Sequence, residues 1–186
     1  MDQLSTIAGT DTFSFCGEKT VWNCVECTRI SNPEVKATPA QVRSEVWMAL
    51  IHGSRGLIYF VHQFKPTFNE AALLDDPEML AGITALNRQI HDLAPILNSP
   101  SVRDGATAES PSPISWMLKR HRNATYLFAV NLRNGPARGS WVLRDLSGEA
   151  EAEVLSESRR VSLRNGALAD DFGPYAVHLY RVRGSN

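Results

Sequence analysis

The sequence predicts two structural classes in one chain: an α/β segment over residues 1–98 and a small antiparallel β-sandwich over residues 99–186. In the first segment, apolar runs alternate with stretches of helical periodicity, which is typical of parallel strands linked through helices. In the second segment, short strands follow one another with turn signals between them. The charge balance changes at the same place, because residues 1–98 hold 7 basic and 11 acidic residues and residues 99–186 hold 12 and 9.

The composition is that of a folded globular protein. The 186 residues are 43% hydrophobic and 21% charged, which excludes an intrinsically disordered chain. A formal net charge of -1 argues against nucleic acid or an anionic membrane as the main partner. The longest apolar run, residues 57–61, is too short to cross a bilayer. We therefore expect neither nucleic acid nor a membrane to be a partner.

A first strand and a first helix open the α/β segment. Residues 20–27 (TVWNCVEC) are rich in β-branched and aromatic residues. Thr38 and Pro39 are typical of an N-cap and the first helical residue, and Gly53 is placed to end the helix. Between them, apolar side chains recur at helical spacing at Val42, Val46, Ala49 and Leu50, with Trp47 alongside.

A second strand and a second helix follow in the same order. Residues 57–61 (LIYFV) are continuously apolar, as in a strand buried on both faces. Asp76 and Pro77 are typical of a second helix start, and one apolar helical face continues from there to Pro95. Two strands cannot close a sheet and would leave unpaired edges. We therefore expect this segment to be part of something larger.

The second segment has strand periodicity. Asn165-Gly166 is a strong hairpin signal, and residues 119–123 are expected to form a solvated turn. Trp116 and Trp141 lie in predicted strands, where they fit either the core or an exposed surface for stacking on sugars. The predicted strands are residues 114–118, 126–131, 141–143, 154–155, 161–163, 167–168 and 176–182.

Glu26 is the most informative single residue. It ends an otherwise largely apolar strand, and ligands of parallel α/β sheets bind beyond the carboxyl ends of the strands. A carboxylate in that position can serve as a nucleophile or general base. By strand alternation it shares a face with Trp22 and Cys24. An ordinary ion pair with Arg29 or Arg43 is an equally good interpretation of the position alone.

His62 and Gln63 occupy the corresponding end of the second strand. Their side chains can bind substrate hydroxyls or simply anchor the loop. Phe64 and Tyr59 are candidates for a sugar-stacking surface or for the core. The C-x-x-C pattern at residues 24–27 lacks the second pair of ligands that a structural zinc site needs, so no metal is predicted.

Together these segments resemble the C-terminal part of a retaining glycoside hydrolase of the clan A type, in which a (β/α)₈ (TIM) barrel precedes a β-sandwich. The resemblance implies a partial TIM barrel, its last two βα units, followed by the sandwich. The matching stretches are residues 21–27 (seventh strand), 38–60 (seventh helix and eighth strand), 75–100 (last helix), and 124–131 and 170–181 (sandwich).

The resemblance implies that Glu26 is the nucleophile, and we expect Arg29, His62 and Gln63 to bind the substrate. Retaining enzymes need a second carboxyl group, and the one in this family follows the fourth barrel strand, for which this sequence has no room. A carbohydrate substrate and no cofactor are expected, and the chain alone is expected to be inactive without the missing barrel portion or another chain. The alternative is a non-catalytic carbohydrate-binding or structural accessory module.

Overall fold

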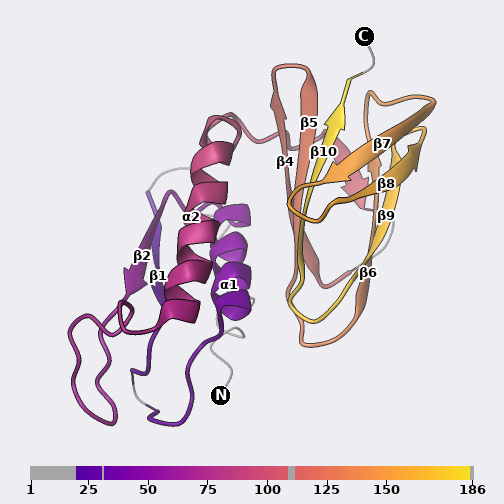
Figure 1. Cartoon of the computed structure of the whole chain (residues 1–186). Helices are drawn as coiled ribbons and strands as arrows, with labels where there is room; N and C mark the ends of the chain where they lie inside the picture. Colours follow the sequence, from indigo (N-terminus) through magenta and orange to yellow (C-terminus); the bar gives the residue numbers. More distant parts are fainter. Residues whose placement is uncertain (1–19, 31, 109–111, 185–186) are drawn as a thin grey trace. The chain divides into compact units, whose positions relative to one another are not determined.

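The structure is a computed structural model that describes residues 20–30, 32–108 and 112–184 (Figure 1). The chain divides between Asp92 and Leu93 into two compact units. We call them the α/β unit and the sheet unit. The α/β unit contains β1 (Trp22–Glu26), α1 (Pro39–Ile51), β2 (Gly56–Phe60) and most of α2 (Pro77–Leu97).

The α/β unit is built around one βαβ crossover. β1 and β2 pair in parallel, with Trp22 opposite Gly56 and Glu26 opposite Phe60. Figure 1 shows both helices on one side of these two strands. The predicted order of strand, helix, strand and helix is confirmed, because the apolar runs and the helical spacing both marked buried surfaces.

The helix ends follow the local chemistry of the sequence. Thr38 caps α1 in a capping box with Gln41, and Gly53 follows the helix with φ 95°. The apolar face that was predicted to continue to Pro95 belongs to a helix that extends two residues further, to Leu97. Proline removes only one donor in the last turn, and the N–H of Asn98 still bonds to the carbonyl of Ala94 at 2.9 Å.

The sheet unit is one antiparallel sheet rather than the two separate sheets of the predicted sandwich. Its strand order is β3-β6-β9-β8-β7-β10-β5-β4. β8 and β9 pair only through Arg164 and Ala167, beside the Asn165-Gly166 turn, so the sheet bends there around its core. The strands are β3 (Ala106–Ala108), β4 (Ile114–His121), β5 (Ala124–Asn131), β6 (Ala137–Leu143), β7 (Glu149–Val154), β8 (Arg159–Arg164), β9 (Ala167–Phe172) and β10 (Val177–Arg183).

Both tryptophans that were candidates for sugar binding pack in or against the core of the sheet unit. Trp141 is 1% exposed and packs edge-to-face against Phe172 at a ring-centroid distance of 6.1 Å. Trp116 is partly buried against the same core cluster. Their core interpretation is therefore confirmed.

The expected solvated turn at residues 119–123 is wrong for Lys119. β4 extends to His121, and the reversal needs only Arg122, with φ 52°, and Asn123. Lys119 is 4% exposed, and its Nζ donates a hydrogen bond to the carbonyl of Ser99 at 2.6 Å. The basic residues 119–122 suggested a solvent-exposed segment, but Lys119 is buried because strand alternation sends neighbouring side chains to opposite faces.

Candidate active site

Glu26 is placed where the sequence predicted, at the carboxyl end of β1. Its side chain is partly buried, and Oε1 accepts a hydrogen bond from the backbone N–H of Ile30 at 3.3 Å. The second oxygen, Oε2, has no hydrogen-bond partner among the residues that the structure describes. One oxygen is therefore oriented by the loop.

Glu26 belongs to a sheet face that the described residues of the α/β unit do not cover. Strand alternation and the register with β2 place Trp22, Cys24, Glu26, Gly56, Ile58 and Phe60 on this face, which we call the open face. Trp22 is 61% exposed and Ile58 is 49% exposed, whereas Val25, on the opposite face, is fully buried. The indole of Trp22 lies directly over Gly56, where a Cβ atom would collide with the ring.

Cys27 and Glu45 lie behind Glu26, on the helix side of the sheet. Burial raises the pKa of Cys27 to about 12, and the nearby charges of Glu45 and Cys24 act in the same direction. Burial also raises the pKa of Glu45, with a further contribution from the charge of Glu26. Cys24 and Cys27 are both free. The C-x-x-C pattern therefore holds a protonated buried thiol, not a reactive dithiol.

Aromatic rings gather at the carboxyl end of β2. Phe60, His62, Phe64 and Phe68 form a continuous cluster with ring-centroid distances of 5.6 to 6.3 Å, which we call the aromatic patch. Phe64 is 48% exposed and Phe68 is 65% exposed. Nδ1 of His62 is buried and has no hydrogen-bond partner within the described residues, and a buried polar atom of this kind calls for a ligand, water or a further chain segment.

Tyr59 does not join the aromatic patch, contrary to one of the two interpretations of the sequence. Its hydroxyl donates a hydrogen bond to Oδ1 of Asn87 on α2 at 2.8 Å. Burial raises its pKa to about 12, with a smaller effect of Cys27. Tyr59 pairs with Val25 in the sheet register, so alternation turns it away from the open face.

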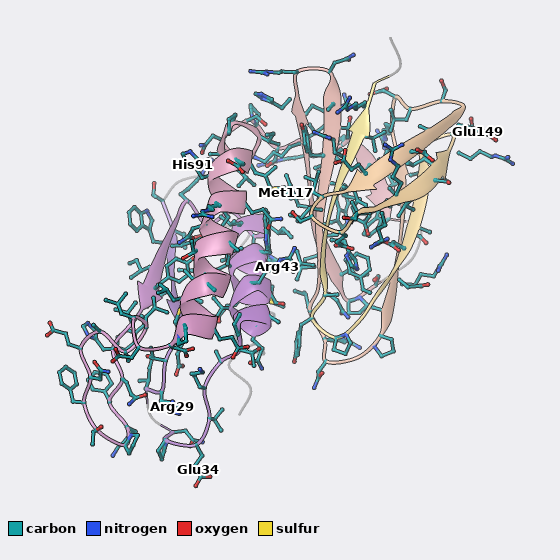
Figure 2. All side chains as sticks on the ribbon, viewed as in Figure 1. Arg29, Glu34, Arg43, His91, Met117 and Glu149 are labelled. Atoms are coloured by element: carbon teal, nitrogen blue, oxygen red, sulfur yellow. The ribbon has the colours of Figure 1, made fainter. Side chains whose placement is uncertain are left out.

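Arg29 and Gln63, two of the four predicted site residues, come together in a cavity of about 340 Å³ between the loops that follow β1 and β2. We call this cavity the loop pocket. In Figure 2, Arg29 lies in the loop at that end of the unit. Glu26 and His62 do not line it. The full lining is Thr28, Arg29, Lys36, Gln63, Asn69, Ala72, Asp75, Asp76 and Pro77.

An ion pair inside the loop pocket joins its two loops. Nζ of Lys36 bonds to Oδ2 of Asp76, whose Oδ1 accepts the N–H of Met79 at 3.1 Å at the start of α2. The hydrogen bond from Lys36 lowers the pKa of Asp76 despite partial burial, with help from the N–H of Met79 and the charge of Arg29. The sequence indicated Asp76 only as a helix start, and nothing in it signalled Lys36 as its partner.

The described residues hold neither a metal-ion site nor a membrane-spanning helix. No group of three or more His, Cys, Asp or Glu side chains among them is arranged to hold a metal ion. None of their helices is long and apolar enough to cross a membrane.

Comparison with known proteins finds likeness in structure alone. No family model matches the chain, and no curated protein matches its sequence. An α-amylase from Geobacillus thermoleovorans, solved with acarbose, has a TM-score of 0.65 at 10% identity, over 95% of this chain and 43% of that one. A GH27 β-L-arabinopyranosidase from Geobacillus stearothermophilus, solved with arabinose, has a TM-score of 0.59 at 14% identity, over 94% and 41%. An Anoxybacillus α-amylase has a TM-score of 0.58 at 9% identity, over 90% and 39%.

These comparisons define the class of fold. The chain has a glycoside hydrolase-like fold, and it spans about two fifths of the length of the enzymes it matches. Identities this low establish the fold alone, because one fold can carry many activities. Function has to be argued from the site.

Proposed function

We propose that this chain is the C-terminal part of a retaining glycoside hydrolase, with Glu26 as its nucleophile. The α/β unit would supply the last two βα units of a TIM barrel, and the sheet unit would be a structural accessory domain. The observation that carries the proposal is the carboxylate of Glu26 at the carboxyl end of a parallel strand, with Oε1 held by Ile30. The glycoside hydrolase-like fold over most of the chain supports it.

The chemistry assigns Glu26 one of two carboxyl roles. Its free oxygen attacks the anomeric carbon while a second carboxyl group, about 5–5.5 Å away, protonates the leaving oxygen. Water then hydrolyses the glycosyl-enzyme bond, and the second group acts as the base. Glu45 is unsuited to that second role, since it lies on α1, behind the sheet. The acid would come from βα units beside β1 and β2, so the chain alone would be inactive.

The exposed apolar surface of the α/β unit supports such a completion. Parallel sheets are normally covered on both faces, and a two-stranded sheet alone is marginal. The exposed large hydrophobic side chains of the described residues are all in the α/β unit, and none is in the sheet unit. They are Trp22, Val35, Ile58, Phe64, Phe68 and Leu74. Further βα units of the barrel, supplied by the same protein or by another chain, would cover the open face.

Carbohydrate is the substrate class that this function requires. Two of the comparison enzymes were solved with a carbohydrate ligand, acarbose in one and arabinose in the other. In this chain His62 and Gln63 would bind sugar hydroxyls, Arg29 would also contact the substrate, and the exposed rings of Phe64 and Phe68 would stack on an apolar sugar face. A separate sugar-binding role for the sheet unit has less support, because Trp141 is buried in its core.

An activated glycosyl inactivator tests the nucleophile on the chain as it is. Dinitrophenyl 2-deoxy-2-fluoroglycosides need little leaving-group protonation, so the absent acid matters less. We expect an intact-mass gain of one glycosyl group, mapped to Glu26 by peptide digestion, for at least one sugar of a gluco, galacto and xylo panel. Glu26→Gln should abolish labelling, while Glu34→Gln, in the exposed part of the same loop, should leave it unchanged. Labelling of another carboxylate would reject the assignment.

A further inference from the structure

Among the residues that the structure describes, Arg29 is the one cation of the loop pocket without a hydrogen-bond or ion-pair partner. Lys36 and Asp76 form an ion pair with each other. Oδ2 of Asp75 accepts a hydrogen bond from Nδ2 of Asn69 at 2.7 Å. The guanidinium of Arg29 makes no hydrogen bond or ion pair within the described residues, although Arg29 is only partly exposed and lines the cavity. Its field acts on Asp76, but that carboxylate is already bound by Lys36.

We propose that the loop pocket binds a sugar that carries a carboxylate, such as a uronic acid residue, with Arg29 holding the carboxylate. This inference rests on the proposed glycosidase function and specifies its substrate class. A guanidinium presents a planar fork of N–H donors that matches a carboxylate with two parallel hydrogen bonds. The amide oxygen of Gln63 and the exposed carboxylate of Asp75 accept hydrogen bonds from sugar hydroxyls.

The lining also discriminates against other ligand classes. A compact polyanion such as inorganic phosphate would place its charge close to Asp75 and Asp76 as well as to Arg29. A neutral sugar would leave the Arg29 charge without a counter-ion in a partly buried position. A ligand with one carboxylate and several hydroxyl donors matches both the guanidinium of Arg29 and the acceptor oxygens of Gln63 and Asp75. The cavity of about 340 Å³ is within the range for small-ligand sites.

NMR titration of the ¹⁵N-labelled full chain tests this inference. We compare methyl β-D-glucuronoside and methyl α-D-galacturonoside with the matching neutral glucoside and galactoside at equal ionic strength, and use sodium acetate as the carboxylate control. We expect at least one uronoside to shift amide signals of the loop pocket with an affinity about tenfold higher than its neutral counterpart. Arg29→Gln should remove that preference, whereas Arg55→Gln, an exposed arginine outside the pocket, should keep it.

Each outcome decides the question. Equal affinity for acidic and neutral sugars, or an unchanged preference in Arg29→Gln, would overturn the acidic class. Shifts with acetate alone as strong as with the uronosides would show simple ion pairing and reject a sugar site, and absence of shifts with every sugar would reject the pocket as a site. Dispersed spectra of each variant establish that it is folded. Labelling of Glu26 by a neutral inactivator would keep the proposed function intact even if the uronoside preference failed.

Discussion

The hydroxyl of Thr28 donates a hydrogen bond of 2.5 Å to the main-chain carbonyl of His62. Thr28 is 3% exposed, and the contact joins the two loops that carry the candidate site. The N–H of Phe64 bonds back to the carbonyl of Arg29 at 3.1 Å, so the loops are tied in both directions. The positions of Glu26 and His62 are therefore mechanically linked.

Replacing Thr28 by valine should loosen this link. The substitution keeps the side-chain shape but leaves the His62 carbonyl without its donor, which costs about 1–3 kcal/mol of unfolding free energy. Urea denaturation followed by near-UV circular dichroism measures the change. Thr67→Val, at an exposed position of the second loop, is the matched control and should change stability little. Equal stability of the two variants would show that the bond contributes nothing.

Gly166 should be essential to the bend of the sheet unit. Its φ is +78°, and a Cβ atom there would collide with the backbone oxygen of Leu143. Its own carbonyl also accepts the N–H of Leu143 at 2.9 Å. We expect Gly166→Ala to lower the free energy of unfolding by more than about 1–2 kcal/mol, the usual cost of a left-handed conformation alone. Gly135→Ala, which meets no atom within 4 Å, should be nearly neutral in the same thermal or urea denaturation.

Much of the α/β unit was predictable because its signals are local. The capping residue Thr38 and the apolar periodicity of α1 act within one or two turns, and strand alternation alone placed Glu26 on the same face as Trp22. The loop pocket was not predictable in this way. Lys36 and Asp76 are 40 residues apart and meet only because a parallel crossover brings two loops to one end of the sheet.

The sheet unit shows a second limit of predicting the fold from the sequence. The strands and the Asn165-Gly166 turn were predicted, but their assembly into one bent sheet was not. Whether β8 and β9 stay paired beyond Arg164 and Ala167 depends on packing of the whole core, not on the turn. Periodicity predicts strands more securely than the sheets they form.

Asp170 should make the sheet unit sensitive to acid. Burial opposes its ionisation, but hydrogen bonds from Arg159 and Tyr180 outweigh that effect and lower the pKa of Asp170 below 3.8. A depressed folded-state pKa gives stability that is fully present above the unfolded value and lost as the pH falls through the folded one. Asp170→Asn should therefore destabilise the protein at pH 7 and flatten the loss of stability below about pH 4.

Asp171 provides the control for that experiment. Its side chain is 79% exposed and pairs with Arg138 at the surface, so Asp171→Asn should change stability by less than about 1 kcal/mol. Urea denaturation of both variants at pH 7 and pH 3 gives the comparison. A similar loss of stability in the two variants would mean that the bonds of Asp170 with Arg159 and Tyr180 contribute no more than a surface ion pair.

The two cysteines of β1 and its loop should react very differently with alkylating agents. Cys24 is exposed on the open face, whereas Cys27 is buried and its pKa is raised to about 12. Because the thiolate is the nucleophile, a raised pKa keeps Cys27 protonated and unreactive at pH 8, and burial blocks the reagent as well. Iodoacetamide under native conditions, followed by peptide mass mapping, should modify Cys24 and leave Cys27 intact until denaturant is added. A covered open face would protect Cys24 too, so its labelling also reports whether that face is free in solution. Comparable labelling of Cys27 in the native protein would contradict the packing of α1 against β1 on which the orientation of Glu26 depends.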